Sequence, residues 1–366
     1  MGKISALIPD GEDLGTLRVV RSLAHSKKVN VHVLSVGQTL RGIHCSRHCK
    51  SYKLRSPRSN DDARLEKILQ ISRRVHIDVL LPVSEEGVIF VASNQRLLNE
   101  HFHIPPIPDH KTLKIASDKW SLNEFAHQRD LPTPKSILFQ NPKGIDSLSS
   151  SFSNPVLLKP RIGGGGKGIQ RFDTASQLLN ALEQQSEALF QNGYLIQEFI
   201  SGSEVDLSVL CQDGKILAYT IQRPVLKAAN SFSYGKVVEF IKHGEIFEIG
   251  QRLLSALNWN GVAHIDFICD EKNERIFILD FNPRYWGTLF GSTVSGVNFP
   301  YLTCLAARGV SFPIPQYKNI VFAIVRRKEI LSWMFGRKHF KGISLGHTNL
   351  RFVMRDPFPS IGKILK

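Results

Sequence analysis

The sequence predicts a mixed α/β and α+β protein with three lobes and a C-terminal extension. Residues 1–105 alternate short apolar runs with amphipathic helical patterns, which is typical of a parallel sheet with right-handed crossovers. Residues 204–281 are rich in strand-like runs and contain a single helical pattern. A chain of 366 residues is also too long for one ordinary hydrophobic core.

The first lobe is expected to span residues 1–108. Three apolar runs, ISALIP, VNVHVLSV and IDVLLPVS, are predicted to be strands. Segments 15–28 and 63–76 lie between them and carry apolar residues at helical spacing. The proline-rich stretch IPPIPDH (104–110) is predicted to be the linker that ends this lobe.

Two further lobes and an extension follow. Residues 109–200 are predicted to form a small lobe with a helical region at 112–127, the strand VLLKP, a glycine run, a helix at 175–189 and the strand YLIQEF. Residues 201–310 are predicted to form a strand-rich lobe from EVDLSVL, KILAYTI, VAHIDFIC and RIFILDF, with a helix at 245–258. Residues 311–366 are less periodic and form a basic extension.

Charge is unevenly distributed. The chain carries a formal net charge of +15, and cations interleaved with aromatic residues crowd its last forty residues. Such a field attracts polyanions, which include nucleotides, nucleic acid and anionic membranes. A solvated basic surface is the favoured interpretation, so no nucleic-acid partner is expected, whereas peripheral contact with an anionic membrane stays open. The cations are Arg326, Arg327, Lys328, Arg337, Lys338, Lys341, Arg351, Arg355, Lys363 and Lys366.

Targeting signals and cysteines indicate the cytoplasm. No apolar run approaches the roughly 20 residues that span a bilayer, and the N-terminus is a poor signal peptide because Pro9 interrupts its apolar stretch. Five scattered cysteines fit a reducing compartment. The HCSRHC segment (44–49) has metal-ligand residue types, but no second pair follows at zinc-site spacing, so a polar basic loop is expected there.

The sharpest local signal is VLLKPRIGGGGKGI (156–169). A predicted strand carries Lys159 into a glycine loop, whose backbone N–H groups can approach phosphate oxygens closely. The loop fits neither the Walker pattern nor the dinucleotide fingerprint. Flexible loops can look alike, but the flanking lysines favour phosphate binding. The loop residues are Gly163, Gly164, Gly165, Gly166, Lys167 and Gly168.

A second group of residues lies about a hundred positions further on, in HIDFICDEKNERIFILDFNPR. Two predicted strands carry Asp266 and Asp280, and strand alternation puts Asp280, Asn282 and Arg284 on one face. If the strands pair as a hairpin, Asp266 can face them. Oxygen ligands held beside phosphates suit Mg²⁺, and the Arg284 cation suits a transferred phosphoryl group. The alternative is a solvated hairpin whose acids are ordinary turn residues. It is disfavoured because Asp280 and Asn282 lie within the run ILDFNP, which is predicted to be a strand rather than a turn.

The order of these motifs resembles that of the ATP-grasp superfamily: a lysine, the glycine loop, QEFISGSE and then D…DFNPR. Residues 1–310 resemble the carboxylate–amine ligase branch of this superfamily, which includes carbamoyl-phosphate synthetase large chain and biotin carboxylase. The resemblance implies the ATP-grasp fold, with an N-terminal parallel α/β lobe, a small grasp lobe and an antiparallel catalytic lobe. It also implies ATP and Mg²⁺ (or Mn²⁺) as cofactors.

The resemblance assigns roles to individual positions. It implies that Asp266, Asp280 and Asn282 bind magnesium, and that Arg284, with Lys159 and Asn282, lies at the reacting phosphoryl group. Relatives usually carry glutamate where this chain has the two aspartates. The residues implied to bind the nucleotide are Lys119, Lys159, Gly163, Gly164, Gly165, Gly166, Lys167, Gly168, Gln197, Glu198, Phe199, Ile200 and Glu204.

The implied reaction joins a small-molecule carboxylate, activated as an acyl-phosphate, to an amine. Substrate contacts are predicted for Arg223, which with Lys227 follows a strand, and for Glu85 and Glu86, at the carboxyl end of the third strand of the first lobe. Two alternatives stay open: a carboxylase or kinase of the same fold, and a nucleotide-binding regulatory protein associated with membranes. A homodimer also stays open.

Overall fold

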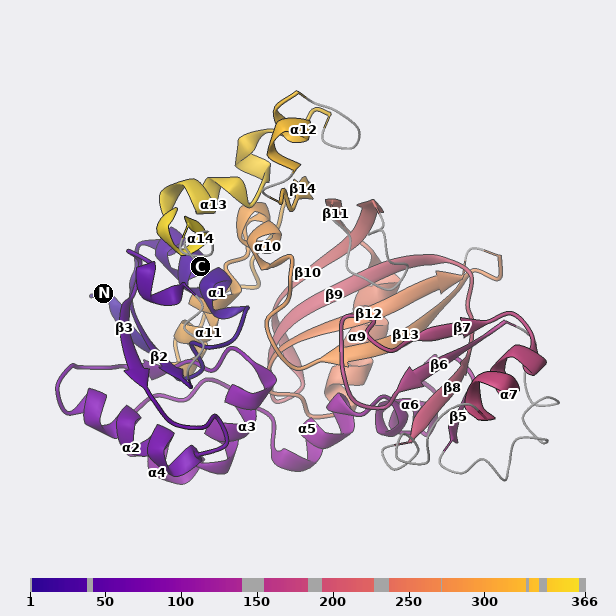
Figure 1. The fold of residues 1–366 in the computed structure, drawn as a ribbon, viewed down its shortest axis with the longest axis horizontal. Helices are drawn as coiled ribbons and strands as arrows, with labels where there is room; N and C mark the ends of the chain where they lie inside the picture. The colour runs from indigo at the N-terminus through magenta and orange to yellow at the C-terminus, as the bar shows by residue number, and fades with distance from the viewer. Residues whose placement is uncertain are drawn as a thin grey trace.

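The computed structural model describes residues 2–37, 42–139, 155–183, 193–226, 237–270, 272–326, 329–335 and 341–361. Its strands form three sheets: four strands in the N-terminal lobe, six in a central lobe and four in a small lobe (Figure 1). Among the described residues, no helix is both long and apolar enough to cross a bilayer.

The N-terminal sheet is parallel, with strand order β3-β2-β1-β4, as the alternating pattern predicts. The sequence did not predict β3, because KSYKL carries few apolar residues. The short 3₁₀ helix Ile43–Cys45 precedes it, where a polar loop was expected. The elements are β1 (Ile4–Ile8), α1 (Thr16–Ser26), β2 (Val29–Val36), β3 (Lys50–Leu54), α2 (Asp61–Ser72), β4 (Val79–Leu80), α3 (Glu85–Ser93) and α4 (Gln95–Asn99).

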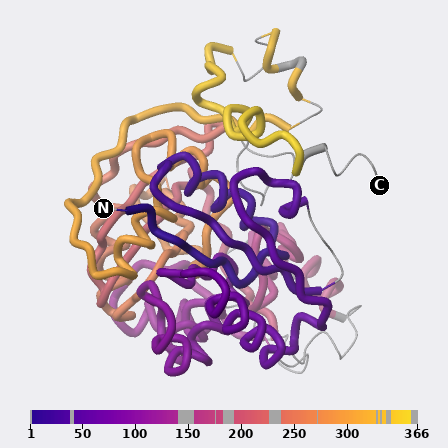
Figure 2. Tube along the Cα trace, turned by 90° about the vertical axis from the view of Figure 1, so that its left-hand side faces the viewer, coloured from indigo at the N-terminus to yellow at the C-terminus, as the bar shows by residue number. Residues whose placement is uncertain are grey.

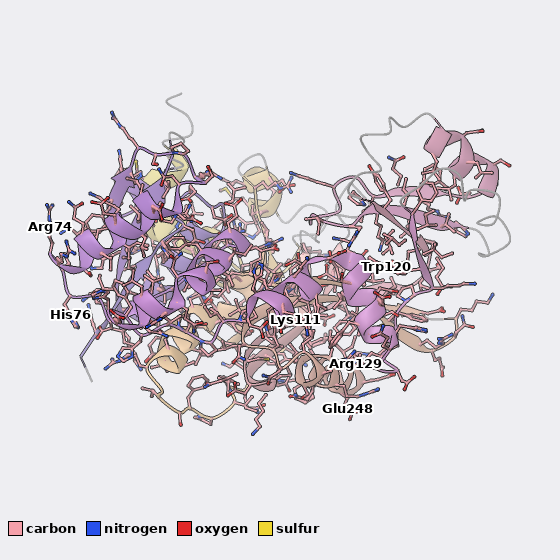
Figure 3. All side chains as sticks on the ribbon, turned by 90° about the horizontal axis from the view of Figure 1, so that it is seen from below. Arg74, His76, Lys111, Trp120, Arg129 and Glu248 are labelled. Atoms are coloured by element: carbon pink, nitrogen blue, oxygen red, sulfur yellow. The ribbon has the colours of Figure 1, made fainter. Side chains whose placement is uncertain are left out.

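Two helices link this lobe to the small lobe. The helical region predicted at 112–127 is split at Asp118 into α5 (His110–Ser117) and α6 (Lys119–His127). Both pack in the core of the central sheet, whereas the sequence analysis assigned residues 112–127 to the small lobe. Seen from below (Figure 3), Lys111 and Trp120 mark these helices between the small lobe and the end that carries Arg74 and His76.

The small lobe is an antiparallel sheet with strand order β5-β8-β6-β7. Helix α7 packs on it through Leu178 and Leu182. Residues 184–189 of the predicted helix at 175–189 lie outside the described residues. The elements are β5 (Ser136–Phe139), β6 (Val156–Pro160), β7 (Gln170–Phe172), α7 (Ala175–Glu183) and β8 (Tyr194–Glu198).

The central sheet has strand order β13-β12-β9-β10-β11-β14, and its described neighbours are antiparallel. The two faces of this sheet differ, as strand β12 shows. Ala263, Ile265 and Phe267 are buried in the core that includes α9, whereas His264 and Asp266 lie on the opposite face because side chains alternate along a strand. The elements are β9 (Ser203–Gln212), β10 (Lys215–Leu226), β11 (Val237–Ile241), α9 (Gly244–Ala256), β12 (Gly261–Asp270), β13 (Arg275–Asn282), α10 (Leu289–Ser295), α11 (Phe299–Ala307) and β14 (Val321–Ala323).

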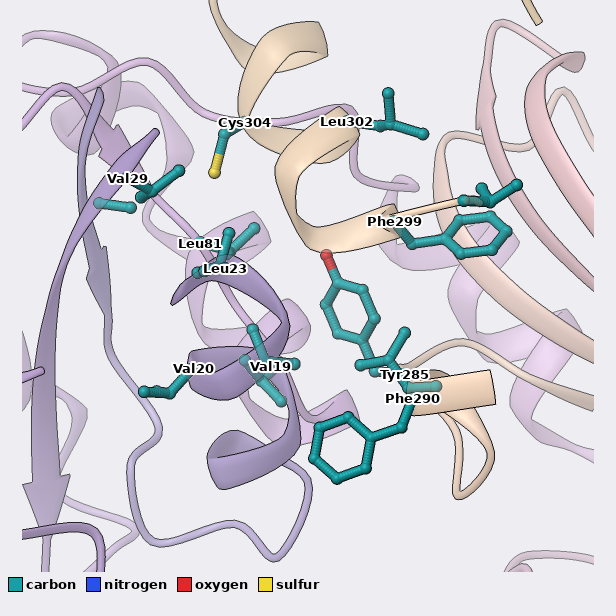
Figure 4. Packing of buried hydrophobic residues seen from close by; sticks show 14 of the residues in the cluster. Val19, Val20, Leu23, Val29, Leu81, Tyr285, Phe290, Phe299, Leu302 and Cys304 are labelled. Atoms are coloured by element: carbon teal, nitrogen blue, oxygen red, sulfur yellow. The ribbon is translucent and has the colours of Figure 1, made fainter. Parts of the chain in front are cut away.

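The segment after β13 joins the central lobe to the N-terminal lobe. Val19 and Leu23 of α1 share a buried core with Tyr285, Phe290 and Phe299 (Figure 4). A continuous apolar core fixes the relative position of the lobes, because separating them would expose these side chains to water. The carboxyl edge of the N-terminal sheet is thereby held beside the central sheet.

The C-terminal extension packs back on the N-terminal lobe. Its described elements α13 and α14 lie beside α1 in both Figure 1 and Figure 2. The buried Asp356 carboxylate accepts hydrogen bonds from Arg21 Nε at 3.0 Å and Ser46 Oγ at 2.9 Å, and Phe352 stacks on Phe290. These contacts, with the pairing of β14, make the extension part of the packed structure. Its helices are α12 (Ile330–Met334), the 3₁₀ helix Leu345–His347, α13 (Leu350–Arg355) and α14 (Phe358–Ile361).

Candidate functional site

Two adjoining cavities lie where the lobes meet. The first, of about 290 Å³, lies between the small and central sheets. The second, of about 400 Å³, lies between the carboxyl edge of the N-terminal sheet and the glycine loop. Asp280, Asn282 and Arg284 line both, so a group bound in one cavity can reach a group bound in the other.

Rows of polar side chains on the central sheet form one wall of the first cavity. The strand register aligns Gln222, Asp206, Asp266 and Asp280 across β10, β9, β12 and β13. A register shift after Asp266 leaves one extra residue, Leu279, in β13, and bulges of this kind re-aim side chains beside sites. The predicted metal ligands therefore face one space.

A second row runs next to the first. Ser208 lies opposite His264, and His264 lies opposite Asn282. Asn282 Nδ2 is 3.5 Å from Asp266 Oδ2, and its Oδ1 accepts a hydrogen bond from Arg284 Nη2 at 3.3 Å. The arginine is thus held at the boundary between the two cavities.

The opposite wall comes from the small lobe and α6. Lys159, on β6, is buried, and its Nζ donates to Gln197 Oε1 at 2.6 Å. Lys119 Nζ lies 3.4 Å from Asp280 Oδ2 and donates to the Gly163 carbonyl at 2.5 Å. Two lysines thus face the carboxylate wall, and one of them also anchors the glycine loop.

The glycine loop lies over the junction of the two cavities. Gly163 and Gly164 line the second cavity, and Gly165 and Gly166 line the first. Gly163, Gly165 and Gly166 have φ values of +127°, +68° and +71°, which only glycine adopts without strain. A Cβ on Gly164 would lie 3.4 Å from both Arg284 Nη2 and Asn282 Oδ1, so the backbone of the loop lies close to these two side chains.

The end of β8 and the segment that follows it complete the first cavity. Gln197, Glu198, Phe199 and Ile200 line it, as does Glu204 at the start of β9. Glu198 is fixed by Lys135, whose backbone N–H donates to Glu198 Oε1 at 2.7 Å. These five residues, which the resemblance implies bind the nucleotide, therefore border the same space as the two lysines.

Burial and like charges perturb the acids of this wall. Burial raises the pKa of Asp206 to about 7, and the neighbouring Glu204 adds to this rise, whereas the hydrogen bond from Gln222 lowers the pKa. Burial and the carboxylates of Asp206 and Asp280 raise the pKa of Asp266 well above its usual range. The wall therefore carries more carboxylates than the surrounding protein neutralises, which suits a cation.

The bases across the cavity are perturbed in the opposite direction. Burial lowers the pKa of Lys159 from 10.5 to about 8, although Asp280 partly opposes this shift. Burial and the Arg284 cation lower the pKa of His264 to about 3, so its ring is neutral at pH 7. A cation bound at the carboxylates would offset their mutual repulsion, and an anion bound at Lys159 would offset the cost of burying its charge.

The second cavity is lined by the carboxyl edge of the N-terminal sheet. Glu85 and Glu86, at the start of α3, border it, as do Asp13 and Arg58. The helix is positioned by Asp10, whose carboxylate accepts hydrogen bonds from the Ser84 backbone at 2.6 Å and the Ser84 hydroxyl at 2.6 Å. Burial raises the pKa of Asp10 to about 6 in spite of these hydrogen bonds.

Some predicted residues do not line either cavity. Arg223 is directed away from Gln222 by strand alternation, and its Nη2 pairs with Glu239 Oε2 at 2.8 Å on the neighbouring strand. Lys167 is exposed, and neither it nor Gly168 lines either cavity. Lys227 lies outside the described residues. A substrate role for Arg223 stays a prediction that this geometry does not favour.

Sequence reasoning missed other residues that border the first cavity. Asp206 shares a strand face with Glu204, and His264 shares one with Asp266, so alternation alone could have identified both. Gln222 could not be found in this way, because only the pairing of β10 with β9 shows which face it occupies. Arg18 reaches the cavity from α1, a contact that depends on how the lobes pack.

This arrangement defines a class of fold: a small antiparallel sheet with a glycine loop that faces a larger antiparallel sheet bearing carboxylates. Residues 116–288 match the family model described as the ATP-grasp domain. The chain therefore carries an ATP-grasp domain, and the resemblance seen in the sequence is confirmed.

Relatives and solved structures agree with this assignment. The arginine-specific large chain of carbamoyl phosphate synthase from Bacillus subtilis is 28% identical over 146 residues, which are 38% of this chain and 14% of that protein. D-alanine–D-alanine ligase from Acetivibrio thermocellus is 26% identical over 202 residues, which are 51% of this chain and 50% of that protein. The matches thus span half or less of these curated relatives.

The fold is also that of a solved enzyme. N5-carboxyaminoimidazole synthetase from Staphylococcus aureus, complexed with ADP, superposes with a TM-score of 0.70 at 17% identity. The superposition covers 92% of this chain and 86% of that one, so it includes the N-terminal lobe as well as the ATP-grasp domain. The predicted mixed α/β architecture is therefore confirmed.

Proposed function

We propose that this protein is an ATP-dependent ligase that activates a carboxylate as an acyl-phosphate and joins it to an amine. The observation that carries the proposal is the wall of Asp280, Asn282 and Arg284, which borders both cavities. Phosphoryl transfer from a nucleotide in the first cavity to an acid in the second has to occur across such a boundary. The likeness to D-alanine–D-alanine ligase supports the same reaction class.

The nucleotide triphosphate would lie between the two lysines and the glycine loop. Lys159 and Lys119 would neutralise phosphate charge, and the backbone of Gly165 and Gly166 would contact phosphate oxygens. The oxygen donors of Asp266, Asp280 and Asn282 fit Mg²⁺, which prefers such ligands and would offset charge on the transferred phosphoryl group.

The chain's own residues would position the acid for transfer. Arg284 would bind its carboxylate, so that one oxygen attacks the γ-phosphorus while the bond to the β-phosphate oxygen breaks and ADP leaves. The amine then attacks the acyl carbon, phosphate leaves, and the amine's proton passes to phosphate or solvent. The acidic side chains of Asp13, Glu85 and Glu86 would attract the acceptor while it is still an ammonium ion.

The partners and location follow from the same proposal. Small-molecule acids and amines are the expected partners, and the five free cysteines support the cytoplasmic location predicted from sequence. Contact of the basic extension with an anionic membrane stays a prediction. Six of its ten cations, namely Arg327, Lys328, Arg337, Lys338, Lys363 and Lys366, lie outside the described residues.

The test is an ADP-release screen in which carboxylic acids and amines are supplied singly and in pairs. A ligase releases ADP only when an acid is present, yields one amide per ADP with the amine, and gives a hydroxamate when hydroxylamine replaces the amine. ADP release that requires bicarbonate instead would identify a carboxylase, and a stable phosphorylated product would identify a kinase. Nucleotide binding without turnover across the screen would contradict the proposal and favour a regulatory protein.

A further inference from the structure

We propose that Asp206, His264 and Asp266 form a second cation site, which has an imidazole nitrogen among its ligands and takes a divalent first-row transition metal such as Mn²⁺. This site is distinct from the all-oxygen set of Asp280 and Asn282, although Asp266 belongs to both. The proposal does not depend on the ligase activity, because the site is formed by residues that face one cavity before any nucleotide binds.

The three side chains come from two neighbouring strands. Asp206 on β9 lies directly opposite Asp266 on β12, and His264 is two residues before Asp266 on the same strand face. His264 Nε2 is 3.7 Å from Asp206 Oδ2 and 3.6 Å from Asp266 Oδ1. One ligand atom from each residue lies within 4.8 Å of the other two, and no other such group is found among the described residues.

These separations suit coordination better than hydrogen bonding. A nitrogen and an oxygen that are each about 2.1 Å from one metal ion lie about 3.4 Å apart at a tetrahedral angle and about 3.0 Å apart at a right angle. A direct N–H···O bond would bring the same atoms to about 2.9 Å. The Nε2 atom therefore faces two carboxylates at distances too long for a hydrogen bond, and a small shift of the side chains would bring all three residues to the spacing of ligands of one ion.

The imidazole ring is held in the orientation that a metal ligand requires. Its Nδ1 atom is 2.9 Å from Ser208 Oγ, and its face stacks on Trp286 with a centroid distance of 5.5 Å and an interplanar angle of 10°. Metal-binding histidines typically engage their second nitrogen in this manner, which fixes the tautomer and the ring plane. Ser208 and Trp286 thus leave Nε2 directed at the two acids.

The carboxylates are oriented as well. Gln222 Nε2 donates to Asp206 Oδ2 at 3.0 Å and to Thr288 Oγ1 at 2.7 Å. Gln222 is 1% exposed and lines the cavity, and its Oε1 atom has no hydrogen-bond partner among the described residues. A buried acceptor without a donor beside this cluster is a group that a bound cation or an ordered water would satisfy.

Asp266 connects this site to the predicted magnesium site. Its Oδ1 atom faces His264, whereas its Oδ2 atom lies 3.5 Å from Asn282 Nδ2. The two oxygens of one carboxylate therefore face different ligand sets. Imidazole suits transition metals, and carboxylate and amide oxygens suit Mg²⁺, so the two sets differ in the metal that they favour.

The test uses the full chain with Mn²⁺ alone and no nucleotide. We expect electron paramagnetic resonance to detect bound Mn²⁺, and pulsed measurements to show coupling to the ¹⁴N nucleus of a directly bound imidazole. His264→Gln should abolish the ¹⁴N coupling and weaken Mn²⁺ binding by about tenfold or more, and Ser208→Ala should weaken it by about tenfold while the coupling stays. His32→Gln is the matched control, because His32 is also a buried histidine but lies on β2, and it should change neither value.

Three outcomes would overturn the proposal. Bound Mn²⁺ without ¹⁴N coupling in the unaltered protein would mean an all-oxygen site. Equal Mn²⁺ affinity in a folded His264→Gln variant would exclude His264 as a ligand, and His264→Asn provides a second variant should the first not fold. Absence of Mn²⁺ binding without nucleotide would mean that the three residues do not form a metal site of their own. Loss of ligase turnover is not used as a readout, so failure of this proposal and failure of the proposed function remain distinguishable.

Discussion

Nucleotide binding should take up a proton at Lys159. Burial favours the neutral amine and lowers the pKa of this lysine from 10.5 to about 8. A bound triphosphate favours the ammonium form and raises the pKa again. If binding restores the ordinary value, the linkage amounts to about 3 kcal/mol, at about 1.4 kcal/mol per pKa unit. The sign follows directly: affinity is greatest below pH 8 and falls as pH rises above it.

The magnitude can be measured between pH 7 and pH 9. Over this range we expect the dissociation constant of a non-hydrolysable ATP analogue to rise about tenfold, because Lys159 changes from mostly charged to mostly neutral. The assay is isothermal titration calorimetry with a chelator present to exclude metal ions. Repeating it in buffers of different ionisation enthalpy should give an uptake of about half a proton per nucleotide at pH 8.

Lys159→Arg is the matched control. Arginine stays charged over this range, so the variant should lose the proton uptake at pH 8 and keep only the weaker pH dependence that Asp206 contributes near pH 7. Identical pH profiles for the two proteins, or no proton uptake by the unaltered one, would refute the argument that a desolvated Lys159 contacts the phosphates.

Three further predictions concern catalysis and stability. Asp280→Ala and Arg284→Ala should each abolish ADP release and leave the circular dichroism spectrum and the unfolding transition unchanged; normal ADP release by either would remove the proposed site. Asp356→Ala should lower the free energy of unfolding by about 3–5 kcal/mol in urea titration, because it leaves the buried Arg21 charge unpaired, and a loss below 1 kcal/mol would contradict this. Truncation after residue 315 removes β14 and the Asp356 contacts, so it should lower the melting temperature, and an unchanged value would show that these contacts do not stabilise the protein.

Local patterns were enough to predict most of the framework. Period-two alternation located β12 and β13, and the β-branched run VNVHVLSV located β2, because the burial of one strand face or of both leaves a direct trace in the sequence. The helices of the extension were not predicted, because α12, α13 and α14 are each too short to show a helical periodicity in the sequence. Strand β11 was also missed, since VVEFI is too short for a periodic signal.

The sequence by itself determined the chemistry of the cleft: a glycine loop beside Lys159, and carboxylates spaced at two residues on a strand. Only the tertiary structure decided which side chains meet. Strand register brought Asp206 and Gln222 into the carboxylate row and turned Arg223 away, and lobe packing set Glu85 and Glu86 across from Arg284. The reason is physical. Alternation and turn chemistry are local properties of the chain, whereas register and lobe contacts depend on residues that are tens to hundreds of positions apart.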